Sequence, residues 1–196
     1  PGDSKEACLE YIERYPHKIT EVDLSVCPEA VLVAVKAKGP VLRNIPKEFW
    51  SEEVLLAAVY NTDEVFHLIE SPSAAVYQVF VRHDPANLYF VPPKKMSRDI
   101  ILVAAEASGD DFMHGASYIP EEMWDKTLFD EIFQHCPSLI TKTPYSRFAT
   151  TEQWLQAIGE NPFKVTCIPP HLNSQAELVK SYEVAVAREK IPLSLS

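Results

Sequence analysis

The chain has 196 residues, of which 46% are hydrophobic and 23% charged, and its formal net charge is −10. These values suit a folded domain or repeat array with its own core, and they exclude a disordered chain. The acidity argues against nucleic-acid binding, which requires clustered Lys and Arg side chains. No apolar run reaches about 18 residues, so no membrane span is predicted.

A repeat of about 23 to 27 residues runs through the chain. Each repeat contains an apolar run, and we call the first residue of that run the opening residue of the repeat. The residues four and eleven positions after the opening residue are also apolar. The opening residues are Cys8, Val31, Val54, Tyr77, Ile101, Leu128 and Trp154. The two later columns are Ile12, Val35, Ala58, Val81, Ala105, Ile132 and Ile158, and Ile19, Leu42, Val65, Leu88, Phe112, Leu139 and Val165.

Within each repeat, the apolar spacing predicts a helix of about three turns. Polar residues such as Ser51, Ser97 and Asp125 are expected to cap these helices, and Thr151-Glu152 marks a similar start. Proline follows eight or nine positions after the opening residue in five repeats, at Pro16, Pro40, Pro85, Pro137 and Pro162. Because proline ends a helix, a short second helical segment should follow it.

We therefore predict an all-α protein, an α-solenoid of about seven to eight helix–turn–short-helix repeats forming one domain over 1–196. A leucine-rich repeat has a similar period, but its strand requires an apolar sixth position, which here is often charged. In chain order, the repeats are expected near 5–27, 28–50, 51–73, 74–96, 97–124, 125–150 and 151–174, with a C-terminal capping helix at 175–190.

The stretch "VLVAVKAKGPVLRNIPKEFWSEEVLLAAV" resembles a bacterial repeat family of unknown function. The motif of that family is V-L-x-A-V, then a G-x-x-L turn and a D/S-x-E-V-V/L restart, and it occurs in effector proteins of intracellular bacteria. The resemblance is good over 28–70, weaker over 98–116 and loose elsewhere. It implies helical repeats and supplies no catalytic residue.

Two surfaces are candidate partner-binding sites. The positions twelve and thirteen after each opening residue would form a ladder along the solenoid, and the alternative is that one column packs the short segments against each other. The ladder residues are Arg43, Phe66, His67, Tyr89, Phe90, Met113 and His114. The second candidate is an acidic docking patch for a basic partner, or else a solvated acidic face, made of Asp110, Asp111, Glu121, Glu122 and Asp125.

Catalytic and metal-binding motifs are missing from the sequence. It contains no HExxH, GxSxG or P-loop, and His67 and His114 are two repeats apart, too far for a shared metal ion in a regular stack. Cys8, Cys27, Cys136 and Cys167 form no CxxC pair and are expected to be buried thiols. No cofactor, metal site or catalytic residue is predicted.

The leading functional hypothesis is a non-enzymatic scaffold that binds a protein or peptide, as part of a bacterial effector. One alternative is an acidic inhibitor that caps a basic partner, and another is an enzyme with a nonlocal active site. The expected location is the cytoplasm, or the host cytoplasm for an effector. The identity of the partner and the oligomeric state stay open.

Overall fold

The computed structural model describes residues 4–142 and 144–169, together with the single residues 172, 178, 180, 183, 184 and 187. The described residues form helices and no strand, which confirms the all-α class. The predicted capping helix at 175–190 lies outside the continuous described part. The α-helices are α1 (Lys5–Arg14), α2 (Glu29–Ala37), α3 (Glu52–Asn61), α4 (Ala74–His83), α5 (Arg98–Ser108), α6 (Met113–Ala116), α7 (Lys126–His135) and α8 (Thr151–Glu160).

Short 3₁₀ helices connect the α-helices. They are η1 (Pro16–Glu21), η2 (Gly39–Asn44), η3 (Lys47–Phe49), η4 (Asp63–Leu68), η5 (Pro85–Phe90), η6 (Gly109–Phe112), η7 (Glu121–Met123), η8 (Pro137–Thr141), η9 (Tyr145–Phe148) and η10 (Pro162–Cys167). Of these, η1, η2, η4, η5, η6, η8 and η10 supply the predicted second segments, and η3, η7 and η9, which were not predicted, precede α3, α7 and α8. Each of the five repeat prolines is the first or second residue of its 3₁₀ helix. Proline suits this place because the first N–H groups of a helix have no internal partner.

Polar side chains cap most of the longer helices. In α1, α3, α4, α5, α7 and α8 the N-cap side chain accepts a hydrogen bond from the backbone N–H three residues later. The predicted caps Ser51, Ser97 and Asp125 are confirmed. The cap of α8 is Thr150, one residue before the predicted start signal, and it forms a capping box with Gln153.

The predicted apolar columns form the core. All seven opening residues, and all seven residues four positions later, are buried. The column eleven positions later is buried from Ile19 to Leu139 in the six repeats whose side chains are described. The α-helices supply the first two columns and the 3₁₀ helices the third, so each repeat contributes both segments to one core.

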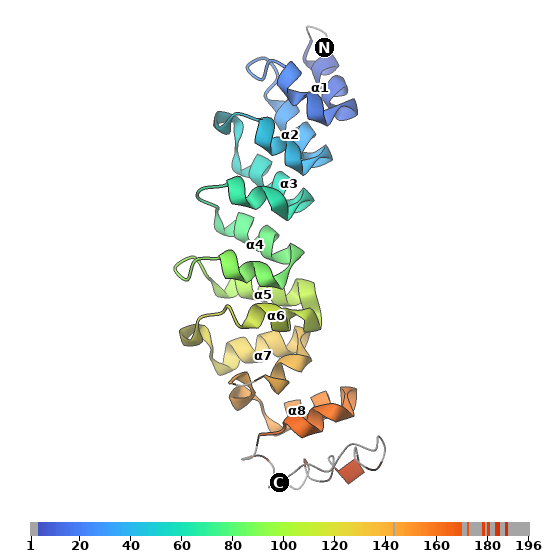
Figure 1. Cartoon of the computed structure of the whole chain (residues 1–196), viewed down its shortest axis with the longest axis vertical. Helices are drawn as coiled ribbons and strands as arrows, with labels where there is room; N and C mark the ends of the chain where they lie inside the picture. Colours follow the sequence, from blue (N-terminus) through green and yellow to red (C-terminus); the bar gives the residue numbers. More distant parts are fainter. Residues whose placement is uncertain are drawn as a thin grey trace. The chain divides into compact units, whose positions relative to one another are not determined.

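The chain divides into two compact units, unit 1 (Pro1–Lys95) and unit 2 (Met96–Ser196). In unit 1, α1 packs on α2, α2 on α3, and α3 on α4, in chain order (Figure 1). In unit 2, α5 packs on α7, and α8 contacts η8 and η10. The division falls within one residue of the boundary between the fourth and fifth predicted repeats. A single domain over 1–196 stays a prediction.

Neighbouring α-helices of unit 1 are parallel. In unit 1, Lys5 at the start of α1 pairs with Glu29 at the start of α2 at 2.5 Å. At the other end, the Asn61 side chain donates a hydrogen bond to the Lys36 carbonyl, 3.2 Å away, which links the ends of α3 and α2. His83 makes a comparable contact from the end of α4 to the Val59 carbonyl at 2.6 Å. Parallel packing of equivalent helices is expected for a tandem repeat, because the helix of each repeat runs in the same direction as the helix of the repeat before it.

Residues 117–125, an insertion relative to the shorter repeats of unit 1, connect α6 to α7 and contain η7. Trp124 of this connection is buried and stacks on Tyr145, with ring centroids 4.1 Å apart. The Tyr145 hydroxyl donates a hydrogen bond to the Ala116 carbonyl at 3.0 Å. The insertion is thus anchored to unit 2 by aromatic packing. No helix in the described part of the chain combines the length and apolar content needed to cross a bilayer.

Candidate functional site

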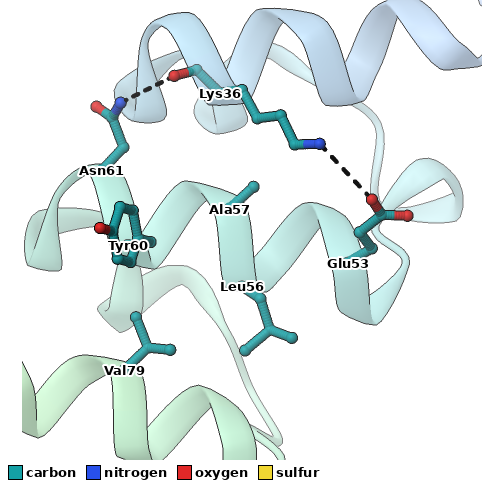
Figure 2. Close-up of a pocket in the computed structure, with 7 residues that line it drawn as sticks. All are labelled: Lys36, Glu53, Leu56, Ala57, Tyr60, Asn61 and Val79. Carbon is teal, nitrogen blue, oxygen red and sulfur yellow. Dashed lines mark hydrogen bonds and ion pairs between the residues drawn. The ribbon is translucent and has the colours of Figure 1, made fainter.

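An open groove crosses α3 in unit 1, and we call it the α3 groove. It has a volume of about 760 Å³ and is lined by Lys36, Glu53, Leu56, Ala57, Tyr60, Asn61 and Val79. Figure 2 shows these side chains, with α2 and α4 on either side of α3. Its floor is apolar, and Tyr60 is 76% exposed to solvent. A large exposed aromatic side chain beside an apolar floor is typical of a binding surface.

The α3 groove exists because α3 is apolar on two faces. Val54, Ala58 and Val59 are buried in the core of unit 1. Glu53, Leu56, Ala57 and Tyr60 follow the spacing i, i+3, i+4, i+7, so they share a second face, on which Leu56 and Ala57 are half-buried and Tyr60 is exposed. The core of unit 1 uses the first of these two faces, so the second is available to contact a ligand.

Polar contacts hold both ends of the α3 groove. Lys36 Nζ and Glu53 Oε1 form an ion pair at 3.7 Å on one side (Figure 2). At the other end, Asn61 donates to the Lys36 carbonyl and accepts a hydrogen bond from the Gly39 backbone N–H at 3.0 Å. Asn61 therefore ties the end of α3 to the end of α2 and to the start of η2.

A second pocket adjoins the α3 groove, and Glu53 lines both. We call it the acidic pocket; its volume is about 460 Å³. The lining residues are Pro28, Glu29, Leu32, Glu48, Phe49, Trp50, Ser51, Glu53 and Val54. Trp50 is held in place by its indole N–H, which donates to the Ile45 carbonyl at 3.0 Å. Carboxylates thus surround an apolar and aromatic floor.

The predicted ladder residues do not share one environment. Arg43, His67, Tyr89, Phe90 and His114 are exposed, and Met113 is half-buried. Phe66 is only 6% exposed and stacks on Phe80 with ring centroids 3.7 Å apart. For Phe66 the surface role is contradicted, because its ring fills the core between η4 and α4.

The structure brings only some of the exposed ladder residues together. His67 and Phe90 are in edge contact, with ring centroids 5.1 Å apart, and Tyr89 contacts Phe90 at 5.2 Å. Arg43 pairs with Glu64 at 3.8 Å. Met113 and His114 belong to unit 2. The aromatic part of the ladder is therefore a small cluster of His67, Tyr89 and Phe90 on unit 1.

The five residues of the predicted acidic patch are divided between two ends of the helices of unit 2. Asp125 caps the start of α7 and pairs with Arg98 of α5 at 3.6 Å. Asp110 lies near the other end, where it accepts a hydrogen bond from the Ser138 N–H at 3.1 Å. The length of α7, about 15 Å, separates these two ends.

The remaining residues of the patch fall on the same two sides. Asp111 is next to Asp110 in η6, and Glu121 and Glu122 are in η7, just before α7. Glu121 is ion-paired with Arg147. The five carboxylates thus do not form one cluster, because the parallel arrangement of α5 and α7 separates them into two groups and several already have partners. Docking of a basic partner by either group stays a prediction.

The cysteines are free thiols, of which Cys8, Cys27 and Cys136 are buried and Cys167 is exposed. The prediction of buried thiols is wrong for Cys167, which lies in η10 at the surface. Burial raises the pKa of Cys136 to about 11. The pKa of Cys8 is also raised to about 11, by burial and by a hydrogen bond with Cys27.

These environments predict the thiol reactivity of the native protein. At about pH 8, Cys167 should react with Ellman's reagent at least about a hundredfold faster than Cys8 and Cys136, because the raised pKa of the buried thiols leaves little thiolate. Unfolding in denaturant should make all four thiols react at similar rates. A second fast thiol in the native protein would contradict the buried positions.

Among the described residues, no group of three or more His, Cys, Asp or Glu side chains is placed to share a metal ion. The α3 groove itself contains no histidine or cysteine, and its one carboxylate is paired with Lys36. Its chemistry is that of an apolar contact surface with polar ends. No protein-family model, curated protein or solved structure matches the chain.

The residues of the α3 groove were missed by sequence reasoning, although a signal exists. Two positions after the opening residue, Val33, Leu56, Val79 and Val103 are apolar and only half-buried. The first, sixth and seventh repeats have Glu10, Asp130 and Gln156 there. An apolar residue at a position that other repeats leave polar therefore indicates a half-buried apolar surface on α2 to α5, of which Leu56 and Val79 line the α3 groove.

Proposed function

We propose that the chain is a non-enzymatic scaffold whose helical repeats stack as an α-solenoid and which binds a protein or peptide in the α3 groove. The observation that carries this function is the second apolar face of α3, with its exposed Tyr60. The stacking is supported by the parallel packing of α1 to α4. Asn61 links the end of α3 to the end of α2, and His83 links the end of α4 to the end of α3. The bacterial effector role and the cytoplasmic or host-cytoplasmic location stay predictions.

The alternative of an acidic inhibitor receives less support from the fold. Its docking patch requires the five carboxylates to act together, and they lie at two ends of α5 and α7. The alternative of an enzyme stays a prediction. The α3 groove is favoured because it gathers apolar side chains from two helices, α3 and α4, into one concave surface.

Peptide selection tests the proposed function. The full chain, immobilised, is used to select binders from a displayed library of random peptides about 12 residues long, and synthetic versions are then measured in solution. Tyr60→Ala should weaken their binding about tenfold or more, because exposed aromatic anchors dominate such contacts. Since Tyr60 is 76% exposed, this change should leave stability within about 0.5 kcal/mol.

The matched control is Phe163→Ala, which removes an aromatic ring that is 54% exposed on unit 2. This variant should bind the selected peptides as the unchanged protein does. If selection yields no peptide whose binding depends on Tyr60, the α3 groove is not a peptide site and the proposed function fails there.

A further inference from the structure

The acidic pocket, next to the α3 groove, favours a ligand that carries a positive charge. Three carboxylates line it, those of Glu29, Glu48 and Glu53, and no Lys, Arg or His does. Its floor is formed by apolar and aromatic side chains, including Leu32, Phe49 and Trp50. A cationic side chain with a long aliphatic stem matches both features, because its stem packs on the floor while its head meets the carboxylates.

The carboxylates are accessible to such a ligand. Within the described part of the chain, the Glu48 side chain makes no ion pair or hydrogen bond. Glu29 and Glu53 pair with Lys5 and Lys36, but at least half of each of these side chains is exposed to solvent. Exposed ion pairs contribute little, so an incoming cation can replace the lysine partner.

The two subsites are joined by α3, which also sets their separation. Glu53 lines both pockets, and Tyr60 lies seven residues further along the same face of the helix. Seven residues of α-helix span about 10 Å. An extended peptide covers this distance in about three residues.

We propose that the α3 groove and the acidic pocket together take an extended peptide that carries a Lys or Arg three residues from an apolar or aromatic anchor. The anchor contacts Leu56, Tyr60 and Val79, and the basic side chain reaches Glu48 and Glu53. This inference rests on the proposed function and names the chemistry of its partner. The overall negative charge of the chain also favours the approach of a basic segment.

The same peptide selection tests the inference through the sequences that it enriches. We expect a basic residue at a spacing of about three from an apolar anchor. Binding of the enriched peptide to Glu48→Gln/Glu53→Gln should be about five- to tenfold weaker at low salt. Raising the salt to about 0.5 M should remove most of that difference, because exposed charges are screened.

The matched control is Asp111→Asn/Glu122→Gln, which removes two exposed carboxylates from unit 2 and changes the net charge equally. This variant should bind the peptide as the unchanged protein does. Equal weakening by both double variants would overturn the inference, since it would show a general effect of net charge.

The remaining outcomes separate the two proposals. Selected peptides that depend on Tyr60 but lack a basic residue would overturn this inference and leave the proposed function standing. A spacing of about seven residues, which a helical peptide needs to span the same distance, would overturn the extended conformation. The absence of any Tyr60-dependent peptide would overturn both.

Discussion

Phe66→Ala should lower the free energy of unfolding by about 3–5 kcal/mol, the range for removing a large aromatic side chain from a core. The Phe66 ring is 6% exposed, stacks on Phe80 and contacts Tyr77 at a centroid distance of 5.5 Å. Truncation would leave a cavity between η4 and α4 and remove the stacking contact. Urea denaturation followed by circular dichroism measures the change.

Tyr89→Ala is the matched control, because Tyr89 occupies the equivalent position in the next repeat. Its side chain is 68% exposed, so the same truncation should change stability by less than about 1 kcal/mol. A large loss for Tyr89→Ala, or a small one for Phe66→Ala, would contradict the assignment of these two rings to surface and core.

Gly39→Ala should destabilise the protein by about 1–3 kcal/mol, the usual effect of adding a methyl group where there is no room. A Cβ atom at Gly39 would lie 2.8 Å from the Ala58 carbonyl oxygen and 2.9 Å from the Asn61 Cβ. The obstacle is backbone and the base of a side chain, so η2 and α3 would have to move apart. That movement would also lengthen the hydrogen bond from the Gly39 N–H to Asn61.

Gly159→Ala provides the control in α8, where an added Cβ meets nothing within 4 Å. Alanine favours helix more than glycine does, so this variant should be more stable by up to about 1 kcal/mol. Thermal or urea unfolding of both variants measures the contrast. Equal effects at the two glycines would show that the ends of α2 and α3 approach less closely than the structure indicates.

Gly39 also affects the α3 groove through Asn61. The close approach of Gly39 places its N–H within reach of Asn61, and Asn61 lines the groove. A side chain at Gly39 would therefore disturb one end of the groove as well as the core. For this reason Tyr60, which lies at the surface, is the better residue for testing binding separately from stability.

The two cysteine classes illustrate how far sequence spacing alone reaches. Cys8 and Cys136 are adjacent to or within apolar patterns, and they are buried. Cys167 lies thirteen positions after Trp154, in the column of His67, Phe90 and His114, and like them it is exposed. The position of a cysteine in the repeat therefore indicates its exposure better than its residue type does.

The sequence by itself determined the helical class, the length of the main helix of each repeat and the core columns. Each of these depends on local chemistry: Ser51 and Ser97 cap helices, Pro85 ends one and begins the next segment, and apolar residues four apart share a helix face. Such signals act within a few residues of each other, so they can be read from one repeat at a time.

Only the tertiary structure decided which residues face solvent and which of them lie together. Phe66 and Tyr89 have equivalent positions, yet one is in the core and the other at the surface, because Phe80 happens to stack on the first. The parallel alignment of α5 and α7 separated Asp110 from Asp125, and the packing of α3 between α2 and α4 left its second apolar face open. These outcomes depend on the shapes of the individual side chains that pack together. The repeat pattern records only which positions are apolar, so it does not contain this information.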